Sequence, residues 1–172
     1  MRPEEAKTIG DFVLSLMEME VPATTSVLSA VPADRLDYRP DALSKTGLGL
    51  VRHITLEDEW FLTMVLEGRF TPPPDDSDAC GVMTPKQAAA RYAERIPARL
   101  ARVRQMSGDD LAREIELFGG VMRMPAVGVL ALAMRHSAHH RGQLSSYLRA
   151  MGGKVPSIYG PTADTQQAAA TA

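Results

Sequence analysis

Apolar residues recur at intervals of three and four along most of this 172-residue chain, the spacing that lines one face of an α-helix. Four segments carry the pattern, and no series of alternating strands accompanies them. They run from Pro3 to Ala30, from Ser44 to about Gly68, from Thr84 to just before Gly108, and from about Pro125 to Met151. The pattern predicts an all-α four-helix bundle. Its long connecting loops exceed what antiparallel neighbours need, so at least one is expected to cross the bundle.

Prolines and cap residues refine these helices. Ser44 and Thr84 are the expected N-caps of the second and third helices. Pro22 should kink or split the first helix, and Pro97 should bend the third. The alternation on each side of Gly119-Gly120 fits either a hairpin or only a structured loop. In the first helix, the stripe expected to face the core comprises Ile9, Phe12, Leu16, Met19, Ala23, Val27 and Ala30.

The chain has the length of one ordinary domain, which we expect to span residues 1–161. Beyond it, TADTQQAAATA is of low complexity and has no pattern that could bury a face. We therefore expect residues 162–172 to form a flexible C-terminal tail.

Composition excludes several classes of protein. Hydrophobic residues make up 45% and charged residues 23%, and no apolar run approaches the length needed to cross a bilayer. Cys80 is the only cysteine, which excludes an internal disulfide and a cysteine-based zinc site within one chain. The start of the chain does not resemble a secretory signal. These features predict a cytoplasmic protein with no membrane partner.

Arginines line one face of the third predicted helix, and the net charge of the chain is only −2. The simplest interpretation is a solvated face, and the alternatives are contact with an anionic cosubstrate or weak contact with nucleic acid. Aromatic residues make up 5% of the chain and offer no stacking platform, so we expect no nucleic-acid partner. The arginines are Arg91, Arg95, Arg99 and Arg102.

Three of the four histidines fall within five residues of the last helix. Residues four apart on a helix share a face, so His136 and His140 can point at one ion, whereas His139 is turned away. The remaining histidine, His53, lies on the inward stripe of the second helix. Three neutral imidazoles in a bundle core would form an open metal site. A histidine pair at this spacing also occurs as hydrogen-bonded core, and spacing alone leaves both interpretations open. Ser137 follows His136 where a zincin peptidase needs glutamate.

The segments LVRHITLEDEWFL, from Leu50, and HSAHHRGQLSSYLRAMGGKVPSIYG, from His136, together resemble the DinB/YfiT-like superfamily of metalloenzymes. The resemblance covers residues 8–161. It implies a DinB-type four-helix bundle that holds a divalent metal, commonly nickel or zinc, through His53, His136 and His140. It also implies a homodimer.

Characterised relatives include S-transferases that use low-molecular-weight thiols such as bacillithiol or mycothiol, a maleylpyruvate isomerase and metal-dependent hydrolases. The resemblance therefore implies a metal-dependent thiol S-transferase or hydrolase that acts on a small electrophilic molecule. The alternative is a non-enzymatic, stress-associated dimer in which the metal stabilises the bundle.

Glu57 is the candidate catalytic residue, because it lies one turn after His53 and could orient water or take its proton. The competing interpretation, slightly favoured by the run Glu57, Asp58, Glu59, is a charge on the solvent side. Gln143 and Tyr147 continue the face of His136 and could contact substrate or an imidazole, or they could simply pack.

Overall fold

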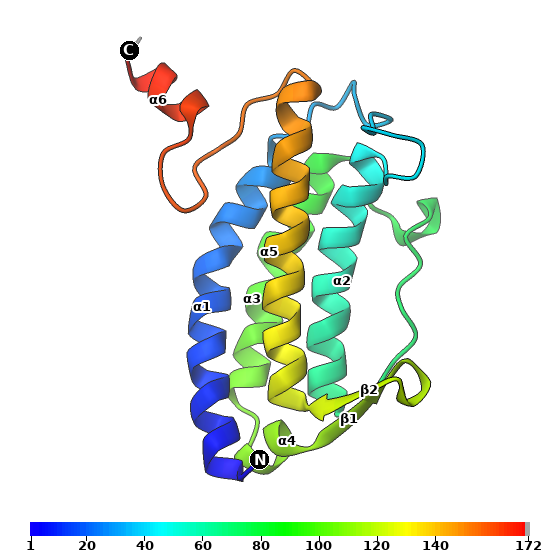
Figure 1. Ribbon diagram of the computed structural model, residues 1–172, viewed down its shortest axis with the longest axis vertical. Helices are drawn as coiled ribbons and strands as arrows, with labels where there is room; N and C mark the ends of the chain where they lie inside the picture. Colours follow the sequence, from blue (N-terminus) through cyan, green and yellow to red (C-terminus); the bar gives the residue numbers. More distant parts are fainter. Residues whose placement is uncertain (171–172) are drawn as a thin grey trace.

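Four long helices lie side by side in the computed structural model, which describes residues 1–170 (Figure 1). The helices are α1 (Pro3–Ser29), α2 (Gly47–Glu67), α3 (Pro85–Arg104) and α5 (Ala126–Ala150). Helix α1 packs against α3 and α5, and α2 packs against the same two helices, so the apolar faces enclose one core. The predicted four-helix bundle is confirmed.

The connection between α2 and α3 crosses the bundle. Helix α2 ends at one end of the molecule, and residues 68–84 then run along its side to the opposite end, where α3 begins (Figure 1). Helices α2 and α3 therefore run in the same direction. This agrees with the prediction, made from the loop lengths, that at least one connection crosses the bundle. A 3₁₀ helix, Asp78–Cys80, lies within this connector.

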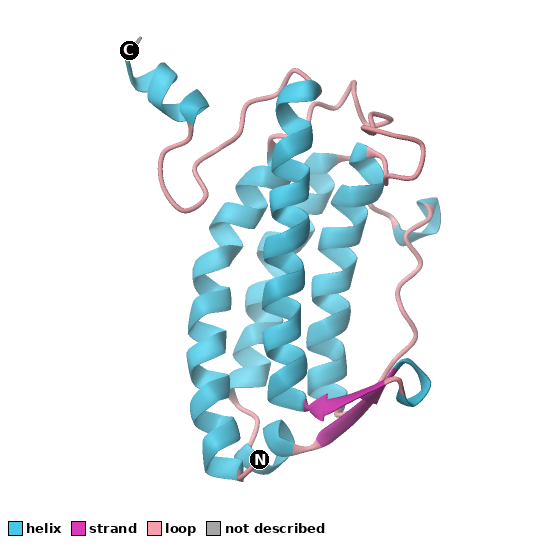
Figure 2. Cartoon of the chain, viewed as in Figure 1, coloured by secondary structure: helices cyan, strands magenta, loops and turns pink. Residues whose placement is uncertain are grey.

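The segment between α3 and α5 contains a short helix and a hairpin (Figure 2). Helix α4 (Gly108–Ala112) leads into strand β1 (Glu114–Leu117), and β2 (Met122–Pro125) pairs with it in antiparallel fashion. A 3₁₀ turn, Phe118–Gly120, joins the strands. Ile115 and Leu117 are buried beneath the bundle end, so the alternation in the sequence reflects a real hairpin.

Helix α2 begins two residues later than the sequence suggested. Thr46 is its N-cap, with its Oγ1 accepting a hydrogen bond from the backbone N–H of Gly49 at 3.1 Å. Ser44 instead donates to the carboxylate of Asp41. Thr84 caps α3 as expected, because its side chain accepts from the N–H of Gln87.

Helix α1 is not split at Pro22, since it continues without interruption to Ser29. Proline removes only one main-chain hydrogen bond, the one to the carbonyl of Glu18. Both residues are solvent-exposed, so water can satisfy the carbonyl that is left free. Pro97 likewise lies inside an unbroken α3.

The face of α1 that meets the core is only partly the one the sequence suggested: Val27 is buried as expected, but three other residues of the predicted stripe are exposed. Ile9, Phe12 and Met19 are exposed, with 41%, 65% and 76% of their surface accessible. The buried residues of the first four turns are instead Ala6, Gly10, Val13, Leu14 and Met17. Helix α1 thus has two apolar faces, and the neighbouring helices cover only one of them.

The expected C-terminal tail contains regular structure. Residues Ala163–Ala170 form helix α6, which the low-complexity sequence did not predict, and the flexibility of residues 162–172 stays a prediction. The carboxylate of Asp164 accepts hydrogen bonds from Arg149 Nε and from the N–H of Val155, which fixes the start of α6 against the end of α5. Residues 171–172 lie outside the described chain. Among the helices of residues 1–170, none is long and apolar enough to cross a membrane.

Candidate metal centre

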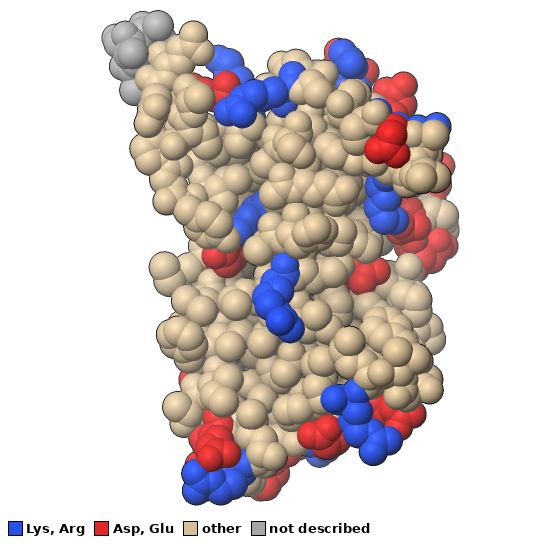
Figure 3. Space-filling view, viewed as in Figure 1, with Lys and Arg blue, Asp and Glu red and all other residues tan. Residues whose placement is uncertain are grey.

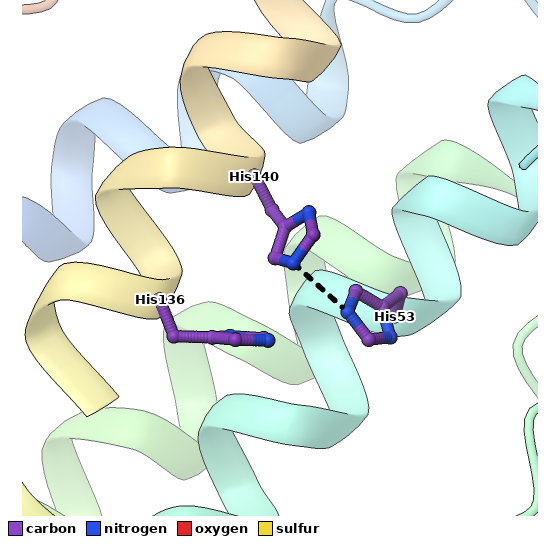
Figure 4. A group of neighbouring side chains, drawn as sticks. All are labelled: His53, His136 and His140. Atoms are coloured by element: carbon purple, nitrogen blue, oxygen red, sulfur yellow. Dashed lines mark hydrogen bonds between the residues drawn. The ribbon is translucent and has the colours of Figure 1, made fainter. Parts of the chain in front are cut away.

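His53 on α2 faces His136 and His140 on α5 across the interface between these helices (Figure 4). The Nε2 atoms of His53 and His140 are 3.1 Å apart, and one nitrogen from each of the three rings lies within 4.8 Å of the others. Within residues 1–170, no other group of three or more histidine, cysteine, aspartate or glutamate side chains is close enough to share an ion. Ligand nitrogens of a tetrahedral zinc ion are about 3.4 Å apart, so the spacing suits a metal.

Helix geometry accounts for this convergence. His136 and His140 are one turn apart and project from the same face of α5, which packs directly on α2. His139 projects outward and is exposed, although its ring still touches that of His140. The structure therefore brings together the three histidines predicted from the sequence and leaves the fourth outside.

Burial keeps the three imidazoles neutral. Removal from water lowers the pKa of His53 to about 4 and that of His136 to about 3, and neighbouring imidazoles lower both further. Burial also lowers the pKa of His140, opposed by its hydrogen bond to Gln143. At neutral pH each ring thus carries a nitrogen lone pair, which is what a metal ligand needs.

Gln143 fixes which nitrogen of His140 is free. Its Oε1 lies 2.9 Å from His140 Nδ1, and a carbonyl oxygen only accepts, so Nδ1 carries the proton. The lone pair is then on Nε2, the atom that points towards His53. Of the two roles considered for Gln143, contact with an imidazole is the observed one. Tyr147 instead donates to the backbone carbonyl of Lys45 and packs against Tyr38.

His136 has an unsatisfied nitrogen in this setting. Its Nδ1 is buried and has no hydrogen-bond partner among the described residues. Buried polar atoms are nearly always paired, so this nitrogen needs a partner that the described residues do not supply. The donor set, three neutral imidazoles whose rings meet at one point, fits a divalent metal ion.

Glu57 lies beside this centre and is largely buried. Its Oε1 is 3.8 Å from His53 Nδ1, and only 15% of its side chain is exposed. Burial raises the pKa of Glu57 to about 7, with smaller contributions from Asp58 and Asp76. A carboxylate with this pKa can both accept and return a proton at neutral pH. The solvent-side interpretation of Glu57 is wrong.

The two acidic residues after Glu57 are also buried, each with its own partners. Asp58 accepts a hydrogen bond of 2.7 Å from the hydroxyl of Tyr92. Glu59 accepts from Arg91 at 2.6 and 3.1 Å, and Arg95 lies 3.3 Å away. The arginines of α3 therefore do not form a simple solvated face, because three of them converge on one buried carboxylate.

Arg141, which follows His140, points to the other side of α5. Its guanidinium is buried and pairs with the carboxylate of Glu20, donates to Thr24 Oγ1 at 3.0 Å and contacts the hydroxyl of Tyr159. It thus ties α5 to α1 and to the segment after α5. A Cβ atom added at the neighbouring Gly142 would meet no other atom within 4 Å, so close helix approach does not explain this glycine.

Arg52 is a buried residue whose role sequence reasoning missed. Its Nε donates to the carbonyl of Val82 at 2.7 Å, and its Nη2 donates to Asp78 Oδ1 at the same distance. These bonds hold the crossing connector against α2, one residue before His53. The sequence did show a charged residue next to a candidate metal ligand, which could have drawn attention to Arg52. Its hydrogen-bond partners, however, lie about 30 residues away in the sequence.

Comparison with known proteins agrees with the architecture. Residues 13–170 match the sequence profile of the DinB family. The chain belongs to the DinB family. It is also similar to the uncharacterised protein YjoA of Bacillus subtilis, with 30% identity over 130 residues, which is 75% of this chain and 82% of YjoA.

Solved structures of DinB-like proteins share the fold. The YjoA crystal structure superposes with a TM-score of 0.64 and 25% identity, covering 90% of this chain and 98% of YjoA. A DinB-like protein of Bacillus cereus gives a TM-score of 0.70 at 23% identity, covering 86% and 95%. YfiT of Bacillus subtilis, described as a probable metal-dependent hydrolase with an unusual four-helix bundle topology, gives 0.65 at 21% identity, covering 83% and 87%.

Proposed function

We propose that this DinB-family protein is a metal-dependent enzyme that acts on a small electrophilic molecule, by hydrolysis or by transfer of a low-molecular-weight thiol. His53, His136 and His140 would hold the ion, nickel or zinc. The observation that carries the proposal is the convergence of three neutral imidazoles beside the largely buried carboxyl group of Glu57. The description of YfiT as a probable metal-dependent hydrolase supports the hydrolytic form.

The chemistry is divided between the ion and the protein. When bound, the ion supplies the Lewis acidity that makes a water or a thiol ionise near neutral pH. Glu57 takes the proton that the water oxygen or thiol sulfur loses as it bonds to the electrophilic carbon. The same carboxyl group then returns the proton to the leaving group. Gln143 keeps the His140 ring in one tautomer and one orientation throughout.

Metal analysis tests the ligands. Elemental mass spectrometry should find nickel or zinc in the purified protein. The metal content of the combined variant His136→Ala, His140→Ala should fall to background. His139→Ala is the matched control, because this exposed histidine lies beside His140 on the same helix and should leave the metal content unchanged. Stoichiometric metal in the double variant would contradict the assignment.

Turnover tests the reaction. The metal-loaded protein should hydrolyse a model ester or consume a model electrophile with bacillithiol or mycothiol, and Glu57→Gln should lower the rate at unchanged metal content. Glu67→Gln, an exposed glutamate on the same helix, should retain the rate. Metal binding that stabilises the fold without turnover of any electrophile would instead favour the non-enzymatic, stress-associated dimer.

The expected homodimer is part of this proposal. The outward face of α1 presents Ile9, Phe12 and Met19, which lie on one side of the helix and are each more than 40% exposed. Uncharged side chains cover much of the α1 side of the face formed by α1 and α5, although a basic side chain lies at the middle of that face over α5 (Figure 3). An apolar helix face of this kind suits burial against a second copy. We expect no nucleic-acid partner, because three of the arginines of α3 approach the single carboxylate of Glu59.

A further inference from the structure

A groove separate from the metal centre lies on the side of α2 that faces α3. It is a groove of about 250 Å³ between α2, α3 and the crossing connector. Its polar lining includes Glu59, Thr63, Thr71, Arg91 and Arg99. Glu59 is six residues after His53 on α2, which turns it about 240° around the helix and about 9 Å along it. The groove is thus separate from the metal centre.

The groove has more positive charge than its own carboxylate balances. Arg91 binds both oxygens of Glu59, and Arg95 and Arg99 approach the same Oε2 at 3.3 and 3.6 Å. Three guanidinium groups therefore surround one buried carboxylate. Guanidinium groups in such surroundings favour carboxylate or phosphate, which they bind through paired N–H donors.

Two donors at this site have no partner within the described chain. Arg99 Nε and Thr71 Oγ1 are both buried and make no hydrogen bond to any described residue. A buried polar group left unpaired costs about 1–3 kcal/mol. Both side chains line the groove although the two atoms themselves are covered, so an anion bound there would pair with them once these side chains rotate towards it. If the arginines served only to neutralise and hold Glu59, the position of Arg91 would be explained. The unpaired donors of Arg99 and Thr71 would not be.

The remaining walls of the groove are apolar. Trp60, Leu56, Pro72 and Pro74 contribute to its lining. The Trp60 ring is mostly buried, and its Nε1 is already satisfied by the carbonyl of Thr71 at 3.0 Å. Its aromatic surface is thus available for packing rather than for hydrogen bonding.

We propose that this groove binds a small organic anion, with its carboxylate or phosphate group on Arg99 and Thr71 and its apolar body against Trp60 and the two prolines. The volume suits a compact ligand, because drug-sized ligands occupy pockets of about 300–1,000 Å³. The site is independent of the metal centre and of the proposed reaction there.

Trp60 provides the measurement, because it is the only tryptophan in the chain and lines the groove. Its fluorescence is recorded while purified protein is titrated with cyclohexanecarboxylate, with inorganic phosphate, and with cyclohexanol as the uncharged counterpart. We expect a saturable change with one or both anions and none with cyclohexanol. The anion that saturates at lower concentration identifies the preferred head group.

Variants locate the binding. Arg99→Gln should weaken it by about tenfold or more, since one charge-assisted contact is lost, while Arg91 and Arg95 still neutralise Glu59. Thr71→Val should weaken it by a smaller factor. Arg102→Gln is the matched control, because Arg102 is exposed on the same helix and does not line the groove.

The metal centre is the competing location for an anion. The titration is therefore repeated with the combined variant His136→Ala, His140→Ala, in which the saturable response should persist. A response lost in this variant would place the anion on the metal and overturn the proposal. The absence of any saturable response, or an equal affinity in Arg99→Gln, would overturn it as well.

Discussion

Replacement of Gln143 by leucine removes the only side-chain acceptor found for His140 Nδ1–H in the described chain, which lies 2.9 Å away. Without it, the proton is free to move to Nε2, and the ring in that tautomer cannot present Nε2 to a metal. Loss of such a supporting hydrogen bond typically lowers metal affinity by about 10- to 100-fold. This range corresponds to about 1.4–2.7 kcal/mol of binding free energy.

A competition titration against a chromophoric chelator measures this affinity for both nickel and zinc. Gln143→Glu is the informative counterpart, because its carboxylate also accepts from Nδ1–H, and we expect it to retain or increase the affinity. Gln143 is only partly buried, so the fold should survive both changes. If Gln143→Leu is folded and binds both metals as tightly as the unchanged protein, the role assigned to Gln143 is wrong.

Three further changes test other parts of the structure. Glu20→Ala leaves the buried Arg141 without its carboxylate and should lower the free energy of unfolding in urea by about 3 kcal/mol, whereas Glu18→Ala, which removes an exposed ion pair of α1, should cost about 1 kcal/mol or less. In metal-free protein, His53 should lower the free energy of unfolding by about 2–3 kcal/mol as pH falls from 6.5 to 4, because the unfolded chain binds the proton that burial denies to this ring, while His136 acts in the same direction and the raised pKa of Glu57 acts in the opposite one. Phe12→Lys should convert a dimer into a monomer in analytical ultracentrifugation.

Each of these has a clear contrary result. Equal urea midpoints for the Glu20 and Glu18 variants would mean that the buried ion pair contributes no more than the exposed one. The pH effect should shrink when His53 is replaced by glutamine, and an undiminished effect would assign it to other groups. A dimer that persists with Phe12→Lys would place the interface away from the outward face of α1.

The metal-ligand candidates were predictable because their geometry is mostly local. The spacing of His136 and His140 places both on one face of any regular helix, whatever the rest of the chain does. His53 followed because it lies on an apolar stripe and is the only histidine outside that cluster. The structure adds the spatial proximity of α2 and α5, which no local pattern contains.

The acidic residues of α2 show where local reasoning stops. Glu57, Asp58 and Glu59 follow one another, and a run of three charges ordinarily lies towards solvent. Helix α2 is instead buried on several sides, since α3, α5 and the crossing connector all cover it. Each carboxyl group meets a different neighbour, and the partners of Glu59 lie 32 to 40 residues further along the chain.

The outward face of α1 illustrates a related limit. Periodicity identifies apolar residues that share a face, and both the stripe containing Phe12 and the one containing Leu14 satisfy it. Only the positions of α3 and α5 decide which stripe becomes core. Helix α6 was missed for a different reason, because polar contacts of Asp164 and Thr162 with the segment after α5 hold its start, and no apolar stripe marks it in the sequence.

Consecutive residues of α5 point to different parts of the molecule, and this has a consequence for engineering the protein. His140 serves the metal centre, while the next residue, Arg141, is locked into α1 and the segment after α5. Any rotation or sliding of α5 would therefore break a buried ion pair before it adjusted the ligands. Helix α2 carries the same kind of constraint, because Arg52, one residue before His53, is buried and tied to Asp78 and to the carbonyl of Val82. Attempts to retune the metal preference by directed evolution should accordingly keep Arg52 and Arg141 and vary the other residues around the three histidines.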